Sequence, residues 1–214
     1  ANPTAYGDLT GANLVVWWFG RLLFDYKFMA LFSMLFGAGI VLFAERAEAA
    51  GNRAARLHYR RMLWLLLFGL AHAYLIWYGD ILVSYALCGM AVYPLRRQRP
   101  WLLLTVGLFL FTAASAVALM HHLNIHDWPL ESYAESLDAW APEADDIAAE
   151  LAAYRGSYWD QMRHRAPEAV FRELRLFLNT SLFRVAGLML MGMALFKLRI
   201  IQGARSPRFY GKMA

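Results

Sequence analysis

The fold class of this chain is indicated most clearly by the stretch Met62–Leu95, MLWLLLFGLAHAYLIWYGDILVSYALCGMAVYPL. It consists of two long apolar runs joined by Gly79-Asp80, and its only acidic or basic side chains are His72 and Asp80. A helix crosses a hydrocarbon core about 30 Å thick with about 17–25 apolar residues. An open strand would leave backbone groups unpaired in lipid, and the alternation of a barrel strand is absent. The stretch therefore predicts two membrane helices joined by a tight turn.

Three further apolar runs, outside this stretch, are long enough to be membrane helices. The composition agrees, because apolar types make up 60% of the chain and charged types 17%, whereas a soluble domain has roughly 45–50% and about 25%. A disordered chain and a disulfide scaffold are excluded by this hydrophobicity and by the single cysteine. We expect an all-α, polytopic transmembrane helix bundle with about five spans, which are Phe28–Ala44, Met62–Tyr78, Ile81–Leu95, Trp101–Met120 and Leu176–Phe196.

The connections between these runs alternate in charge. Lysine and arginine gather in 45–61, 96–100 and 197–214, whereas Gly79-Asp80 has no basic residue and 121–175 has eleven acidic residues against five arginines. Basic connections face the cytoplasm, so we expect a bacterial inner (cytoplasmic) membrane protein with 1–27 and 121–175 outside. The net charge of +5 comes from these clusters and not from one basic face, so the expected partner is the lipid bilayer and not a nucleic acid.

Four regions follow from this topology. Residues 1–27 form an outer interfacial segment, 28–120 a four-helix transmembrane region, 121–175 an extracytoplasmic helical insert, and 176–214 the fifth transmembrane helix with a cytoplasmic tail. The insert has one apolar helical face, and it either caps the membrane region or floats on the headgroups. The first residue is not Met and the last ten resemble a loop, so we expect a piece of a longer chain.

Polar side chains at membrane depth are the candidate functional residues. An ionisable group there costs roughly 2.5–3.5 kcal/mol, so such groups line cavities or pair with one another. Six polar residues fall in the predicted outer half, and glycines that suit close helix packing fall mainly in the inner half. This asymmetry predicts a polar pocket that is open toward the outer face. The polar residues are Ser33, His72, Asp80, Ser84, Asn179 and Arg184; the glycines are Gly37, Gly39, Gly69, Gly89, Gly187 and Gly192.

Each polar residue also has a structural alternative. His72 can hydrogen-bond a neighbouring helix, Asp80 can cap the helix that follows it, and Arg184 can extend its charge to the interface. The serines and Asn179 can join helices to one another. No metal site is expected, because the histidines near position 121 lack the ligand spacing of a zinc site. No phosphate loop or dinucleotide fingerprint is present.

Several short motifs resemble the YeiB-like family of bacterial inner-membrane proteins. They are Phe32-Ser33-x-Leu35-Phe36-Gly37-x-Gly39, Gly69-x-x-His72, Gly79-Asp80-Ile81-Leu82 and Tyr85-Ala86-x-x-Gly89. The resemblance covers 25–95 strongly and 176–214 loosely, and it implies a longer chain. More distantly, the family is similar to the transmembrane acyltransferases, which move acyl groups from cytoplasmic acyl-coenzyme A to a sugar or lipid by means of an intramembrane histidine.

The resemblance implies an acyltransferase-like enzyme that uses acyl-coenzyme A as a donor substrate and has no tightly bound cofactor. His72 would be the general base, because a histidine titrates near neutral pH, and Asp80 would orient its ring. The substrate, a small molecule or a lipid-linked one, would contact Lys27, Ser33, Ser84, Asn179 and Arg184. Two alternatives stay open: a carrier, which would give flux without product, and a structural or signalling protein, which would depend on the insert. A homo-oligomer is compatible with all three.

Overall fold

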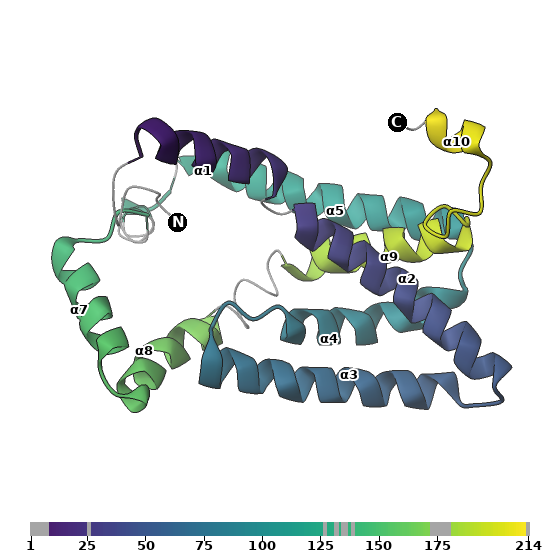
Figure 1. Cartoon of the computed structure of the whole chain (residues 1–214), viewed down its shortest axis with the longest axis horizontal. Coiled ribbons are helices and arrows are strands. Elements are labelled where there is room, and N and C mark those ends of the chain that lie inside the picture. Colours follow the sequence, from purple (N-terminus) through teal and green to yellow (C-terminus); the bar gives the residue numbers. More distant parts are fainter. Residues whose placement is uncertain are drawn as a thin grey trace.

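A computed structural model describes residues 9–24, 27–125, 128–130, 133, 137, 140–171 and 181–212. Within these residues every regular element is a helix (Figure 1). The helices are α1 (Gly11–Leu23), α2 (Lys27–Ala49), α3 (Ala54–Ala71), the π turn η1 (His72–Ile76), α4 (Leu82–Val92), the 3-10 turn η2 (Tyr93–Arg97), α5 (Pro100–Leu123), α7 (Ala144–Arg155), α8 (Tyr158–Phe171), α9 (Leu182–Lys197) and α10 (Pro207–Gly211).

A bundle is formed by helices α2, α3, α4, α5 and α9, which pack against one another along the long axis of the molecule (Figure 1). Helix α9 is central and packs against α2, α4 and α5, while α3 packs against α4. The core lies between them and contains fully buried side chains such as Tyr85, Met189 and Met193. Helix α1 precedes the bundle and has no buried residue.

Glycine lets α2 and α9 approach each other to backbone contact. A Cβ atom built on Gly37 would lie 2.0 Å from the carbonyl oxygen of Met189, and one on Gly192 would lie 1.9 Å from that of Met34. Neither distance is sterically possible, so any side chain here would separate the helices. The same packing role was expected of Gly39 and is wrong, because its face of α2 has no atom within 4 Å of a Cβ.

In the part of the chain that the structure describes, two stretches are long and apolar enough to cross a membrane, namely Gly11–Ala49 and Pro100–Leu123. The other three predicted spans have shorter α-helices. Helix α3 has 18 residues and begins inside the basic segment, α4 has 11 and ends two residues before Pro94, and α9 has 16. At about 1.5 Å per residue, α4 is about 16 Å long. The predicted run Leu176–Phe196 begins outside the described residues.

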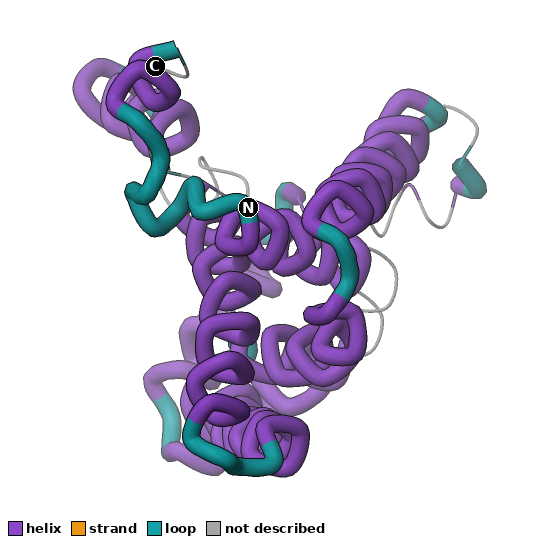
Figure 2. The backbone as a smooth tube through the Cα atoms, turned by 90° about the vertical axis from the view of Figure 1, so that its right-hand side faces the viewer, coloured by secondary structure: helices purple, strands orange, loops and turns teal. Residues whose placement is uncertain are grey.

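The two ends of the bundle differ in composition. The α2–α3 connection, η2 and the segment after α9 meet at one end, which we call the basic end (right in Figure 1). Figure 2, turned so that this end faces the viewer, shows the bundle helices end-on with loops joining them. At the opposite end, α7 and α8 form an elbow, and α8 contacts η1. The acidic insert and the basic connections therefore lie at opposite ends.

Candidate functional site

His72 and Asp80 form a hydrogen-bonded pair at the end opposite the basic end. The Nδ1 atom of His72 lies 2.9 Å from Oδ1 of Asp80. Eight residues separate the two positions, and the turn at Gly79 brings the chain back beside α3. The carboxylate is fully buried, whereas the imidazole is 34% exposed. The acidic partner is therefore shielded from water while the ring stays accessible.

Asp80 also holds the first turn of α4. Its second oxygen, Oδ2, accepts a hydrogen bond of 2.8 Å from the backbone N–H of Val83. Asp80 thus does both: its Oδ2 atom caps α4, and its Oδ1 atom contacts His72. A carboxylate fixed by the helix in this way can orient the imidazole through Nδ1. Among the described residues, no group hydrogen-bonds the other ring nitrogen, Nε2.

The backbone around His72 departs from the α-helix. Residues His72–Ile76 form a π turn, which the backbone N–H of Trp77 closes with a 2.8 Å bond to the carbonyl oxygen of His72. Gly79 lies against this turn, and a Cβ there would lie 2.5 Å from the ring of Trp77, so that ring would have to move. Single π turns in helices are frequent at functional sites. The turn was not predicted, because hydrophobic periodicity does not distinguish it from an α-helix.

Three of the five predicted substrate-binding residues line one cavity of about 360 Å³, which we call the α2–α9 cavity. Lys27 and Ser33 come from α2 and Arg184 from α9. The remaining wall is largely apolar, with Ser181 as a further hydroxyl, and consists of Met29, Ala30, Phe111, Ser181, Val185 and Leu188. Two cations beside an apolar wall suit a ligand with an anionic group and a hydrocarbon part.

Ser33 connects this cavity to α4. Its hydroxyl donates to the carbonyl oxygen of Met29 at 2.7 Å and lies 2.5 Å from the hydroxyl of Tyr85. Tyr85 is on α4, five residues after Asp80, and its own hydroxyl is 3.2 Å from the Met29 carbonyl. Tyr85 was not among the predicted site residues, although a tyrosine in a buried apolar helix usually needs a partner for its hydroxyl.

The other two predicted substrate-binding residues do not join this group. Ser84 is half-buried on α4 and is not among the residues that line the α2–α9 cavity. Successive residues of an α-helix are about 100° apart, so Ser84 and Tyr85 project in different directions, and only Tyr85 meets Ser33. Asn179 lies outside the described residues.

Arg165, which like Tyr85 was not predicted as a functional residue, attaches the insert to the π turn. Arg165 of α8 is 6% exposed, and its guanidinium donates to the carbonyl oxygens of Leu75, at 3.2 Å, and Ile76. Tyr158 donates from its hydroxyl to the same Leu75 oxygen at 2.9 Å. Helix α8 of the insert therefore docks on the bundle, as in the alternative in which the insert caps the membrane region. Nothing in the local sequence identifies these partners, which lie about ninety residues away.

No group of three or more His, Cys, Asp or Glu side chains within the described ranges is arranged to hold a metal ion. The ring of His121, one of the histidines near the end of α5, packs against Trp128 with centroids 4.2 Å apart.

Comparison with known proteins gives relatives without an assigned activity. The chain is 31% identical over 218 residues to the uncharacterized protein YeiB of Escherichia coli (strain K12), covering 98% of this chain and 51% of YeiB. The uncharacterized protein YxaH of Bacillus subtilis (strain 168) is 44% identical over 105 residues, covering 48% of this chain and 26% of YxaH. An uncharacterized 39.9 kDa protein in the amylase 3' region of Bacillus acidopullulyticus is 37% identical over 92 residues. No family model and no solved structure matches.

The chain is thus similar to YeiB along nearly its whole length, and it spans about half the length of that relative.

Proposed function

We propose that this chain belongs to the YeiB-like family and contributes about five transmembrane helices to a protein of the bacterial inner membrane, with its basic end in the cytoplasm. The similarity to YeiB supports the family, and the gathering of basic connections at one end supports the orientation. The outside of the bundle is apolar, with Leu35, Trp64 and Phe109 each more than half exposed. Many other large apolar side chains are exposed as well, and extensive exposed apolar surface is rare on soluble monomers.

We further propose that the protein transfers an acyl group to a hydroxyl of an envelope sugar or lipid, with His72 as the general base. One observation carries this proposal: Nδ1 of His72 lies 2.9 Å from the buried Asp80 carboxylate, while Nε2 has no partner among the described residues. This is the arrangement in which an imidazole accepts a proton at Nε2 and a carboxylate stabilises the resulting imidazolium.

The proton balance of the step follows from this geometry. Nε2 of His72 removes the proton from the acceptor hydroxyl as its oxygen attacks the thioester carbonyl carbon of acyl-coenzyme A. Because coenzyme A is cytoplasmic and His72 lies at the opposite end of the bundle, the proposal requires the acyl thioester to enter from the basic end and reach His72 along the bundle. The carbon–sulfur bond breaks, and the imidazolium returns the proton to the leaving thiolate. No serine or cysteine side chain hydrogen-bonds His72 in the described part of the chain, so the acceptor oxygen is the nucleophile.

The α2–α9 cavity supports a lipid-like or anionic substrate. Lys27 and Arg184 supply positive charge, and the Arg184 guanidinium suits a carboxylate or phosphate with two parallel hydrogen bonds. The apolar wall around Phe111 and Leu188 suits a hydrocarbon chain. His72 and Asp80 are not among the residues that line this cavity. The proposal therefore requires a substrate that is held in the cavity at one end and extends to Nε2 of His72 with its hydroxyl.

A transfer assay tests the proposal. Inverted membrane vesicles that contain the full-length protein are given radiolabelled acetyl-coenzyme A, and covalent label is measured in the extracted lipids and sugars. We expect label in one extract, and a decrease of about 10²–10⁴-fold for His72→Ala, because general-base catalysis contributes a factor of this size. His121→Ala is the matched control and should keep full activity. Label transfer by His72→Ala at the wild-type rate, or uptake of a solute without covalent product, would refute the proposal, and the second result would favour a carrier.

A further inference from the structure

The basic end contains a second cavity, of about 460 Å³, far along the bundle from His72. It is lined by Arg53 and Arg56 from the start of α3, Arg96 and Arg97 from η2, and Glu48 and Asn52 from the end of α2 and the loop after it. Three separate parts of the chain thus converge on it. A volume of this size is in the range of small-molecule sites, which is about 300–1,000 Å³.

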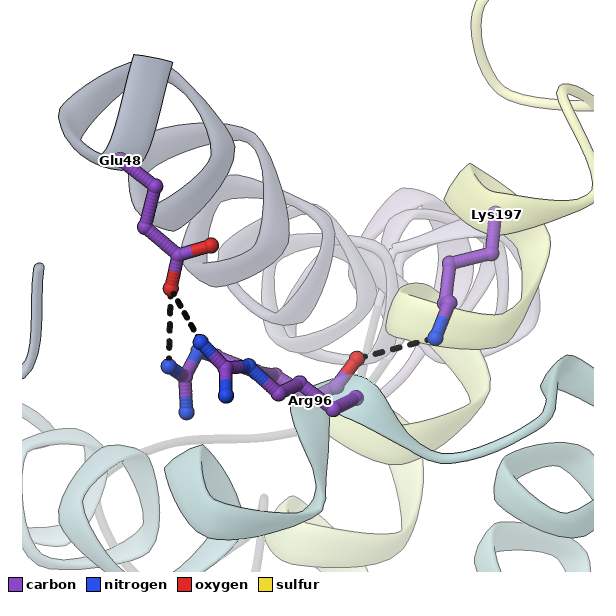
Figure 3. Close-up of polar contacts among 4 residues, drawn as sticks. Glu48, Arg96 and Lys197 are labelled. Atoms are coloured by element: carbon purple, nitrogen blue, oxygen red, sulfur yellow. Dashed lines mark hydrogen bonds and ion pairs between the residues drawn. The ribbon is translucent and has the colours of Figure 1, made fainter. Parts of the chain in front are cut away.

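The charges around this basic-end cavity do not balance. Oε1 of Glu48 accepts from Nη2 of Arg96 at 3.0 Å and from Nη2 of Arg97 at 3.1 Å (Figure 3). The side chains of Arg53 and Arg56 have no hydrogen-bond or ion-pair partner in the described part of the chain. Four guanidinium groups and one carboxylate leave three uncompensated positive charges around the cavity.

Arg96 is held in place by the ring of Tyr93, which packs against its guanidinium, and by Lys197, which bonds its main chain. The Arg96 guanidinium lies over the ring of Tyr93 at 4.0 Å, and this ring stacks on the buried imidazole of His58 at 4.2 Å. From α9, the Nζ atom of Lys197 donates to the main-chain oxygen of Arg96 at 3.0 Å (Figure 3). It also donates to the main-chain oxygen of Gln98. Arg96 is therefore positioned before any ligand arrives, which lowers the entropy lost on binding.

Helix α3 adds to the positive potential. It is 18 residues long, has no acidic residue in its first turn and has no side-chain cap. Its first residues, Ala54 and Ala55, line the cavity together with Arg53 and Arg56. The N–H groups of a first helical turn have no partner within the helix and attract anions, so they reinforce the four arginines.

We propose that the basic-end cavity binds a phosphate group, carried by a soluble small molecule or by a lipid headgroup. The planar guanidinium fork matches phosphate oxygens with paired hydrogen bonds. A site with three surplus positive charges suits a multiply charged phosphate better than a single carboxylate. This site is separate from the α2–α9 cavity and does not depend on the acyl-transfer proposal.

Binding of pyrophosphate tests the soluble source. The full-length protein in phosphatidylcholine nanodiscs is titrated with pyrophosphate by calorimetry at low salt. We expect binding that weakens at least tenfold in Arg53→Gln/Arg56→Gln, because a hydrogen bond to a charged group contributes enough for about a tenfold change. Arg208→Gln removes an exposed charge of α10 at the same end and should leave the affinity unchanged.

Nanodiscs that contain phosphatidic acid test the lipid source. If pyrophosphate does not bind, a rise in the unfolding temperature with phosphatidic acid that is lost in Arg53→Gln/Arg56→Gln, and kept in Arg208→Gln, assigns the site to a headgroup phosphate. If neither probe acts on the wild type, or if Arg208→Gln loses as much as the double variant, the proposal is wrong.

Glu48 provides a variant with the opposite expected effect. Glu48→Gln removes the carboxylate that occupies Arg96 and Arg97 and adds one more uncompensated positive charge. We expect it to bind whichever probe acts on the wild type several-fold more tightly. A general loss of structure would weaken binding in every variant, so tighter binding by Glu48→Gln cannot come from misfolding. Unchanged or weaker binding by a folded Glu48→Gln protein contradicts the proposal.

Discussion

Arg165 donates a hydrogen bond from Nη2 to the carbonyl oxygen of Leu75 at 3.2 Å, and from Nη1 to that of Ile76. These carbonyls are at the C-terminal end of the continuous α3–η1 helix, where the helix dipole is negative and a cation is favourable. The guanidinium is almost completely buried there. Helix α8 is thereby attached to the turn that carries His72.

Replacing Arg165 should release the insert. In Arg165→Met the two carbonyl oxygens lose charged donors in a buried setting, which costs about 1–3 kcal/mol. We expect faster hydrogen exchange of the α8 amides and lower transfer activity, because the π turn is then held less firmly. Exchange measured by mass spectrometry on the full-length protein checks this result.

Arg163→Met is the control for that change. Arg163 is two residues away on α8, is 83% exposed, and has only a 3.7 Å pair with Asp160, an interaction that contributes little at a surface. Equal exchange rates in the two variants would show that the Arg165 contacts do not hold the insert.

Two substitutions of Asp80 should separate its catalytic role from its structural one. Asn caps helices as well as Asp does, so Asp80→Asn should keep α4 and the stability of the protein. It should nevertheless lower transfer activity about 10²–10⁴-fold, because an amide neither stabilises the imidazolium nor enforces the tautomer. Asp80→Ala should also lose about 0.5–2 kcal/mol of stability with the cap. The checks are the transfer assay and thermal unfolding, and full activity in Asp80→Asn would leave Asp80 with a capping role only.

The contact between His72 and Asp80 could be anticipated from sequence because it is local. A glycine turn between two antiparallel runs brings residues eight positions apart beside each other, and polar groups among apolar ones seek partners. The gathering of basic connections at one end follows in the same way from the alternation of charge between successive runs. Both inferences use only neighbouring segments of chain.

The contacts of Tyr85 and Arg165 could not be anticipated, because each depends on long-range packing. The partner of Tyr85 is 52 residues away and the partners of Arg165 about 90. The packing of Gly39 shows the same limit. It is two residues from Gly37 in one apolar helix, yet only Gly37 faces α9, and composition does not say which side of the helix is covered. The early end of α4, by contrast, could be anticipated from Pro94, because a proline inside a helix ends or kinks it; the 3-10 turn Tyr93–Arg97 that follows was not predicted.

The start of α8 should depend on pH below about 4. Asp160 accepts hydrogen bonds from the side chain of Ser157 at 2.6 Å and from its backbone N–H at 3.1 Å, and these bonds hold the pKa of Asp160 below its ordinary value of 3.8. A carboxyl group whose pKa is lower in the folded state stabilises that state above its unfolded pKa. The contribution is lost as the pH falls through the folded value.

We therefore expect α8 amide exchange to be constant from pH 7 to about 5, after correction for intrinsic rates, and to accelerate at lower pH. Asp160→Asn should remove this acceleration, because no proton is then taken up at that position. An unchanged acid response in Asp160→Asn would assign the effect to another group.

Two alanine substitutions on α2 should have opposite effects on stability. Gly37→Ala places a methyl group 2.0 Å from the Met189 carbonyl oxygen, so α2 and α9 must separate, and overpacking of this kind typically costs about 1–3 kcal/mol. Gly39→Ala meets no atom within 4 Å and gains about 0.5–1 kcal/mol from the higher helix propensity of alanine. Thermal unfolding in one detergent should therefore give a lower midpoint than wild type for Gly37→Ala and an equal or higher one for Gly39→Ala. Because both variants add the same methyl group to the same helix, equal midpoints would mean that α2 and α9 do not meet at Gly37.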